Sequence, residues 1–166
     1  TAYHRLMECL DYTAVDSESQ IHKQITALTE AKKMEYEEAQ CIRIQDIMTF
    51  LHSEIGQRMK KAFEADQLYR EQPFVLAQSM KNIEKDWNGE ETVLVQGIID
   101  AYFIEDEEIV LVDYKTDKVR KGEEQHLIDL YHTQLEDYAQ ALERMLQKKV
   151  KETCIYSFTL GKMIPV

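Results

Sequence analysis

The stretch EIVLVDYKT, residues 108–116, decides how the rest of the chain is interpreted. Its four consecutive apolar residues, 109–112, are typical of a strand that is buried on both faces. They run directly into Asp113, Tyr114 and Lys115. A carboxylate and an ammonium are costly to bury unless they are paired or bound to an ion. We therefore expect the end of this strand to provide a partner for both charges.

A second apolar segment, residues 92–104, precedes this strand and is separated from it by an acidic stretch centred on residues 106–107. A two-residue hairpin turn there places Asp100 directly opposite Asp113, with their Cβ atoms about 5 Å apart. Because side chains alternate along a strand, Lys115 lies on the same face as Asp113. The predicted hairpin therefore gathers two carboxylates and one ammonium on one face.

Two carboxylates at this separation repel each other, and a hard divalent cation such as Mg²⁺ or Mn²⁺ suits them as a shared partner. The alternative is a plain surface ion pair, which is the commoner origin of an isolated Asp-x-Lys. A register slip of one residue would also move Asp100 to the opposite face. Apolar residues on both faces of the hairpin favour the buried cluster. We expect one face to carry Ile99, Ala101, Phe103, Val110 and Val112, and the other Ile98, Tyr102, Ile104 and Leu111.

Residues 123–148 return to the period of an amphipathic helix. Gln134 and Tyr138 lie four residues apart, on the stripe that also carries apolar side chains. A buried amide without a partner costs about 1–3 kcal/mol, so Gln134 would need a phosphate, a water network or Lys115. The alternative is a residue at the helix edge, facing solvent.

The chain before residue 71 is predicted to be helical, and the remainder to form a sheet with a covering helix. A first short helix begins after Thr1, a second begins at Asp16 or Ser17, and a third spans residues 42–65. Strands are predicted at 73–80, 92–104, 108–116 and 153–160, with a short extension at 162–166. Glu71 either belongs to the periphery of the charged cluster or forms a helix-to-strand salt bridge. The pattern predicts an α/β fold: a central β-sheet flanked by helices, with an N-terminal helical region.

The composition limits the classes of function. At 166 residues we expect one domain, and 20 basic against 31 acidic residues give a net charge of −11. Such a chain does not hold DNA or an anionic membrane by charge alone, although it can act on DNA within a larger assembly.

Its three cysteines show no C-x-x-C spacing, so we expect free thiols in a reducing cytosol and no zinc or iron–sulfur site. No membrane segment or signal peptide is expected. The chain begins at Thr1 inside helical sequence, so we expect a piece of a longer protein.

An aspartate, then Asp-x-Lys, then a helix with Gln-x-x-x-Tyr resembles the PD-(D/E)xK nuclease superfamily and its RecB-like branch. The sequence is most similar to the C-terminal nuclease domains of AddA-type subunits of bacterial helicase–nucleases. Six segments carry this resemblance: TAYHRLMECLD (1–11), FLHSEIGQRMKKA (50–62), YREQPFVL (69–76), QGIIDAYFIEDEEIVLVDYKTDKV (96–119), YHTQLEDYAQALERM (131–145) and IYSFTLGKMIPV (155–166).

The resemblance implies a restriction-endonuclease-like fold and a RecB-like nuclease domain over residues 1–166, with a helical part at about 1–70 and a catalytic core at about 71–166. It also implies a role for each site residue. The implied metal ligands are His4, Asp100, Asp113 and the backbone carbonyl of Tyr114, the implied catalytic lysine is Lys115, and the implied contacts to the DNA strand are Gln134 and Tyr138. The implied ion is Mg²⁺, with Mn²⁺ as a substitute.

The function that the resemblance implies is a DNA exonuclease and endonuclease that processes double-strand ends for recombinational repair and cuts the 3′-terminated strand. The implied partners are single-stranded DNA, a helicase motor in the same polypeptide and an AddB-like subunit, in the bacterial cytoplasm. AddB-type nuclease domains carry flanking iron–sulfur cysteines, which are missing here. Two alternatives stay open: a catalytically silent interaction module of the same fold, and a nuclease of a phage or CRISPR-associated system.

Overall fold

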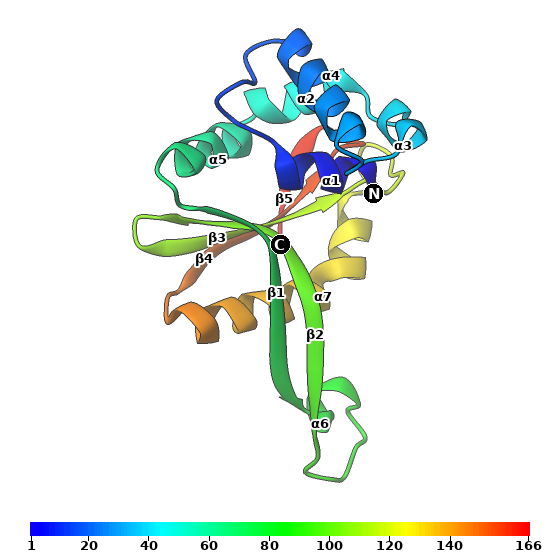
Figure 1. Cartoon of the computed structure of the whole chain (residues 1–166). Helices are drawn as coiled ribbons and strands as arrows, with labels where there is room; N and C mark the ends of the chain where they lie inside the picture. Colours follow the sequence, from blue (N-terminus) through cyan, green and yellow to red (C-terminus); the bar gives the residue numbers. More distant parts are fainter.

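The structure, a computed structural model, describes all residues from 1 to 166 and shows a five-stranded mixed sheet with helices on both faces (Figure 1). The strands are β1 (Leu68–Ser79), β2 (Thr92–Glu105), β3 (Glu108–Lys115), β4 (Val150–Ser157) and β5 (Lys162–Pro165). They lie in chain order across the sheet, and all neighbours are antiparallel except β3 and β4. The predicted α/β fold with a mixed central sheet is confirmed.

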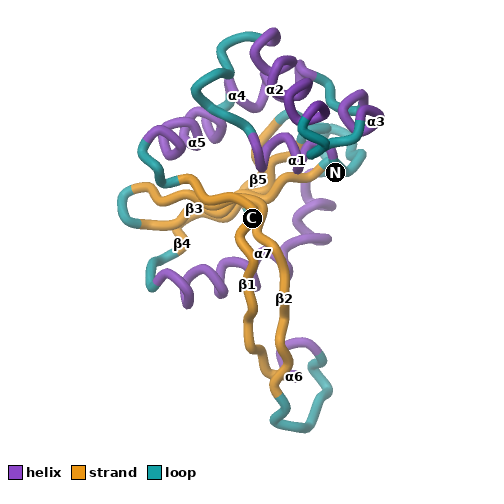
Figure 2. Tube along the Cα trace, in the orientation of Figure 1, coloured by secondary structure: helices purple, strands orange, loops and turns teal.

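Seven helices accompany the sheet: α1 (Ala2–Cys9), α2 (Glu18–Glu30), α3 (Tyr36–Gln40), α4 (Ile44–His52), α5 (Glu54–Glu64), α6 (Met80–Ile83) and α7 (Glu124–Leu146). None of them combines the length and the apolar character that crossing a membrane requires. The first five helices cover one face of the sheet, and α7, which connects β3 to the parallel β4, covers the other (Figures 1 and 2).

Strand β3 separates two hydrophobic cores. Val110 and Val112 belong to the core shared with α1 to α5, whereas Ile109 and Leu111 belong to the core shared with α7. A strand with an apolar layer on each side has no polar face, which explains its uninterrupted apolar sequence.

The hairpin of β2 and β3 has the predicted register, and both residues of its turn, 106–107, have positive φ (52° and 66°). This backbone conformation suits the twist of antiparallel strands. The pairing reaches Ala101 opposite Val112 and ends there. Beyond that pair, β2 forms ladder bonds only with β1 and β3 only with β4, so the two strands separate at Asp100 and Asp113. We call this separation point the fork.

Beyond the fork, residues 72–79 of β1 and 92–99 of β2 form a two-stranded arm that projects from the body and carries α6 at its tip (Figures 1 and 2). Ala101 packs in the core of the N-terminal helices, whereas Ile99, two residues earlier, packs in the core of α7. Residues two apart on a regular strand share a face, so β2 turns over at Asp100. The prediction that Ile99 shares a face with Ala101 is therefore wrong. Ile98, which was predicted to share the apolar face of Tyr102, is exposed to solvent.

The edge strand β1 turns over at the same level. The pairing of β1 with β2 passes from Arg70–Ala101 to Gln72–Ile99 and leaves out Glu71 and Asp100. Glu71 has a φ of 50°, a left-handed conformation that is uncommon for a residue with a side chain. The strand also starts earlier than predicted and contains Pro73. A proline is tolerated there because the outer side of an edge strand makes no ladder bonds.

The predicted helix 42–65 is two helices, α4 and α5, which separate at Ser53. Ser53 has an extended backbone, and its hydroxyl donates to the carbonyl of Phe50 and accepts from the N–H of Gly56. It therefore caps the new helix. The apolar stripe continues through the break, which is why the period did not reveal it. Helices α3 and α6 were not predicted, and β4 begins and ends three residues earlier than predicted.

Replacing Gly56 by alanine is expected to destabilise the chain by about 1–3 kcal/mol. The added Cβ would lie 2.0 Å from the carbonyl oxygen of Phe50, so α4 and α5 would have to move apart. Urea unfolding followed by circular dichroism measures the change. Gly89→Ala is the matched control, because the added carbon meets only the flexible carboxylate of Glu91. Equal stabilities of the two variants would contradict this account of the break.

Candidate active site

Helix α1 brings His4 to the fork. The Thr1 hydroxyl caps α1 by accepting from the backbone N–H of His4 (3.3 Å), and it also lies 2.7 Å from the ring nitrogen Nδ1. Leu6 and Met7 are fully buried in the core and hold the helix against the sheet. The imidazole is therefore oriented by a capping residue and by the packing of its own helix.

His4, Asp100 and the backbone of Tyr114 contact one another. The N–H of Tyr114 donates to Asp100 Oδ2 (2.9 Å), and His4 Nε2 lies 2.9 Å from the Tyr114 carbonyl oxygen and 3.2 Å from Asp100 Oδ2. Because both neighbours of Nε2 are acceptors, we assign the ring proton to this nitrogen. The hydrogen bond to Asp100 is the main cause that raises the pKa of His4.

Asp113 and Lys115 form a buried ion pair beside this group. The ammonium lies 2.8 Å from Asp113 Oδ2, and the Asp113 residue is only 3% exposed. The ammonium is the cationic partner of Oδ2, which receives no hydrogen bond from any other group of the chain. Burial, and then the charge of Asp100, raise the pKa of Asp113 to about 6 despite the opposing effect of Lys115. A further cation near this carboxylate would relieve both effects.

Tyr131 of α7 holds Lys115 from the other side. The Lys115 Nζ lies 3.9 Å from the centre of the Tyr131 ring, and the Tyr131 hydroxyl donates to Asp117 Oδ2 (2.7 Å). That hydrogen bond is the main cause that raises the pKa of Tyr131 to about 12, so the phenol stays neutral. The sequence analysis did not assign Tyr131 or Asp117 to the site. The available signal was their spacing, with Asp117 two residues after Lys115 and Tyr131 one helical turn before Gln134.

The two predicted strand contacts on α7 have different surroundings. Tyr138 is buried, and the charges of Asp113 and Asp100 are, after burial, the causes that raise its pKa to about 12. Its ring is therefore within electrostatic reach of both carboxylates. Gln134 is exposed to solvent. The expectation that Gln134 is a buried amide in need of a partner is wrong, and the helix-edge alternative describes its position.

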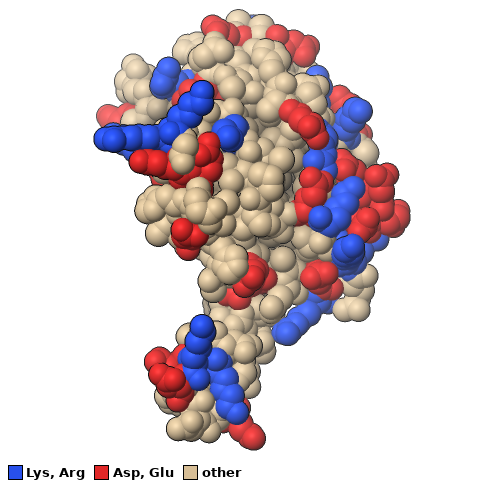
Figure 3. Space-filling model, turned by 180° about the vertical axis from the view of Figure 1, so that it is seen from behind, with Lys and Arg blue, Asp and Glu red and all other residues tan.

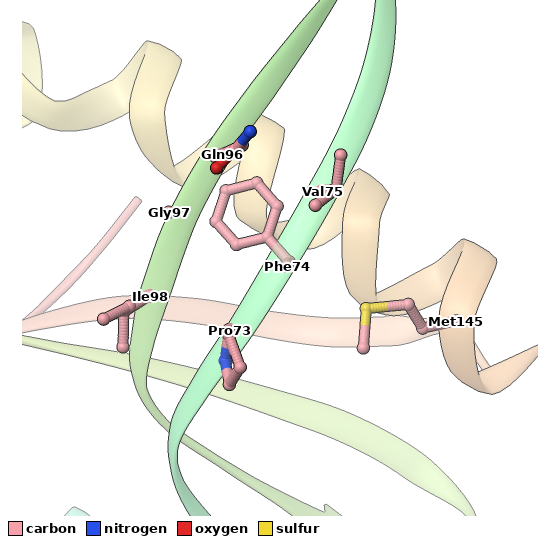
Figure 4. A pocket seen from close by; sticks show the side chains of 7 residues that line it. All are labelled: Pro73, Phe74, Val75, Gln96, Gly97, Ile98 and Met145. Atoms are coloured by element: carbon pink, nitrogen blue, oxygen red, sulfur yellow. The ribbon is translucent and has the colours of Figure 1, made fainter.

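Gly97 leaves the space that Phe74 needs to pack against Tyr138. The rings of Phe74 and Tyr138 pack edge to face with their centres 5.1 Å apart. A Cβ on Gly97 would lie 2.7 Å from the ring of Phe74 and 3.5 Å from that of Tyr138. Figure 4 shows Phe74 on β1 lying across towards Gly97 on β2, beside an open cavity of about 550 Å³. The glycine three residues before Asp100 thus positions Tyr138 through packing.

Glu71 belongs to the periphery of the site. It forms no ion pair, so the predicted helix-to-strand salt bridge is wrong. Burial, and then the charges of Asp100 and Glu8, raise the pKa of its carboxyl group. Together with His4 and Arg5 it lines a cavity of about 400 Å³. Acidic and basic side chains alternate over much of the surface seen from behind, without one continuous basic face (Figure 3).

The donor atoms at the fork suit a small hard cation. Neighbouring ligands of an octahedral Mg²⁺ with bonds of about 2.1 Å lie about 3 Å apart. His4 Nε2 has this separation from the Tyr114 carbonyl oxygen and from Asp100 Oδ2, and the buried Oδ2 of Asp113 has the ammonium of Lys115 as its polar partner. However, no group of three His, Cys, Asp or Glu side chains surrounds a common point. The predicted ligand set is only partly assembled, because Asp113 is turned towards Lys115.

A forked hairpin with Asp at one branch and Asp-x-Lys at the other, covered by a crossover helix, defines a class of phosphodiester-cleaving enzymes. The sequence profile of the PD-(D/E)XK nuclease superfamily matches residues 1–163. The chain belongs to this superfamily: it is a nuclease with the restriction-endonuclease-like fold, and nucleases of this class generally use divalent metal ions.

The chain is also similar in sequence to individual proteins of known name. The chain is 41% identical over 164 residues to the A subunit of the ATP-dependent helicase/nuclease of Alkaliphilus metalliredigens, an alignment that covers 98% of this chain and 14% of the relative. It is 35% identical to the protein of the same name from Clostridium perfringens and 36% identical to that from Bacillus cytotoxicus, in each case over 100% of this chain and 14% of the relative. The chain thus spans about one-seventh of the length of these relatives.

Tyr131→Leu is expected to slow cleavage about tenfold, because Lys115 loses the ring that holds its ammonium. Tyr131→Phe keeps the ring and loses only the bond to Asp117, so most of the rate should remain. Single-turnover cleavage of labelled single-stranded DNA, with binding measured separately, gives both values. Equal rates for the leucine variant and the unmodified chain would show that the ring does not position Lys115.

Proposed function

We propose that this nuclease hydrolyses phosphodiester bonds of single-stranded DNA with Mg²⁺, for which Mn²⁺ can substitute. The observation that carries the proposal is the fork itself, where His4, Asp100 and the Tyr114 carbonyl converge next to the buried pair of Asp113 and Lys115. Carboxylate and carbonyl oxygens of this kind suit a hard divalent ion, the imidazole adds one borderline nitrogen donor, and an adjacent ammonium suits a phosphate.

In the proposed reaction His4, Asp100, Asp113 and the Tyr114 carbonyl would hold the ion, after the proton on His4 Nε2 has been released. The ion would polarise the scissile phosphate and lower the pKa of the attacking water. Lys115, held between Asp113 and the Tyr131 ring, would donate to a phosphate oxygen or orient the water, and would offset the negative charge that develops during attack.

Tyr138 and Gln134 are proposed to contact the DNA strand next to the bond that is cut. Tyr138 offers a fixed aromatic ring at the wall of the site, because Phe74 and Gly97 determine its position. Gln134, one helical turn away, offers an exposed amide that can reach a phosphate or a base edge.

The names of the relatives support a wider proposal. We infer that residues 1–166 form a single nuclease domain of a larger helicase–nuclease polypeptide, which also contains a helicase motor and pairs with an AddB-like partner. Its proposed role in the bacterial cytoplasm is the processing of double-strand DNA ends for recombinational repair, with cutting of the 3′-terminated strand. A net charge of −11 is consistent with the DNA being held largely by those other parts.

The direct test is degradation of end-labelled single-stranded DNA by the chain with Mg²⁺, with Mn²⁺ and with EDTA, in parallel with Lys115→Ala. Cleavage that needs the metal and is lost in the variant supports the proposal. Metal binding without cleavage would mean that DNA delivery depends on another part of the assembly. Neither binding nor cleavage would favour a catalytically silent module.

Asp113→Asn is expected to abolish cleavage and, without divalent ions, to stabilise the chain at pH 8 by up to about 3 kcal/mol, the limit that the raised pKa of Asp113 sets. The pKa of Asp113 is about 6 in the folded state and 3.8 in the reference state, so the folded state loses stability as the pH rises between these values. The gain from asparagine should therefore be absent below pH 3.8 and complete above about pH 7. Urea unfolding at several pH values measures it.

The matched control for this comparison is Asp86→Asn, which removes an exposed carboxylate on the loop of the arm. Its stability should follow that of the unmodified chain at every pH. A destabilised Asp113→Asn variant at pH 8, or one that cleaves at the unmodified rate, would contradict the assignment.

A further inference from the structure

A cavity of about 250 Å³ adjoins the active site and takes no part in the reaction described above. Its walls come from the loop after β3, which contributes Thr116 and Lys118, and from the residue before α4, Arg43. Tyr3, which precedes His4, completes the side nearest the site. Thr116 and Tyr3 are thus direct chain neighbours of the active-site residues Lys115 and His4.

Arg43 and Lys118 are the two cations of this cavity. Both are exposed, and neither forms an ion pair with a carboxylate of the chain. Other lysines of the chain are also unpaired, so it is the placement of these two in one cavity that matters. Asp46, the acidic residue of the cavity, accepts a hydrogen bond from the Tyr3 hydroxyl (2.6 Å). Its charge is therefore partly satisfied.

The remaining walls are formed by packed aromatic rings and by hydroxyl groups. The rings of Tyr3 and Phe158 pack with their centres 4.9 Å apart, and the Tyr3 hydroxyl accepts from the backbone N–H of Arg43 (3.0 Å). The backbone of Arg43 is thereby tied to α1, the helix that carries His4. Thr116 and Thr159 line the same space with hydroxyl groups.

We propose that Arg43 and Lys118 bind one phosphate of the DNA strand adjacent to the phosphate that is cleaved, an inference that rests on the proposed function. A guanidinium fork matches two phosphate oxygens, and an ammonium adds a point charge. Lys118 lies three residues after Lys115, so it is at most about 10 Å further along the chain, the reach of one or two nucleotides. Such a contact positions the strand without reading its sequence.

The test compares Arg43→Gln/Lys118→Gln with Lys23→Gln/Lys61→Gln, which removes two exposed, unpaired cations from α2 and α5 and so makes the same change of charge. Binding of labelled dT12 is measured by fluorescence anisotropy over a range of salt concentrations, in an Asp113→Asn background that should bind without cutting. The cavity variant should bind roughly tenfold more weakly, and its dependence of log affinity on log salt should be shallower by about 0.7 per lost phosphate contact. The control variant should change neither value.

A second measurement locates the phosphate. Single uncharged methylphosphonate linkages are placed at each position around the cut, with the otherwise unmodified chain and the cavity variant compared. At one position next to the cut, the neutral linkage should weaken binding by the unmodified chain and have no further effect on the cavity variant. Additive losses at every position, or unchanged binding by the cavity variant, would overturn this inference while the proposed function stands. An unmodified chain that binds Mg²⁺ but no DNA would also overturn this inference, and one that binds neither would overturn both.

Discussion

The separation of β2 from β3 after the pair Ala101–Val112 is the constraint on which the rest of the site depends. A backbone N–H and carbonyl that lose their ladder partners inside a protein must find others. At Tyr114 the N–H bonds to Asp100 and the carbonyl contacts His4. The same event that interrupts the sheet therefore brings together the carboxylate of Asp100, the carbonyl oxygen of Tyr114 and the imidazole of His4, which lies about 100 residues earlier in the chain.

The charges at the fork are arranged for chemistry at the expense of stability. Asp113 is buried beside a second carboxylate, and its one cationic neighbour, Lys115, does not offset the cost fully. Lys115 in turn is held by a carboxylate and an aromatic face, which limits its freedom without neutralising it. Perturbed acids with specific charge partners are characteristic of functional sites, and a domain without such a site would replace them with apolar residues.

The sequence specified the hairpin well and the surroundings of the site less well. The register of β2 on β3 follows from two apolar runs and a two-residue turn, so Asp100 and Asp113 could be assigned to the same region. The point at which β1 turns over contains a left-handed residue, Glu71, and nothing distinctive in the sequence marks that conformation. The sequence carries no signal for the role of Tyr131, because an aromatic residue on an apolar stripe looks the same whether it fills a core or covers an ammonium. His4 could be assigned only by resemblance, since its partners lie far along the chain.

The arm differs from the body in local stability. The ladder bonds of its strands join only each other, and Arg144 of α7 adds one hydrogen bond to the carbonyl of Ala77, whereas at the fork the strands join a five-stranded sheet with a core on each face. Backbone amides in such a two-stranded extension open at a lower free energy than those of a central sheet and exchange their hydrogens sooner. Asp100 lies at the boundary, with Ala101 in the protected sheet and Ile99 in the arm. Asp100, one of the proposed metal ligands, therefore lies at the junction of two parts of the fold that can open separately. Opening of the arm alone leaves its neighbour Ala101 in place.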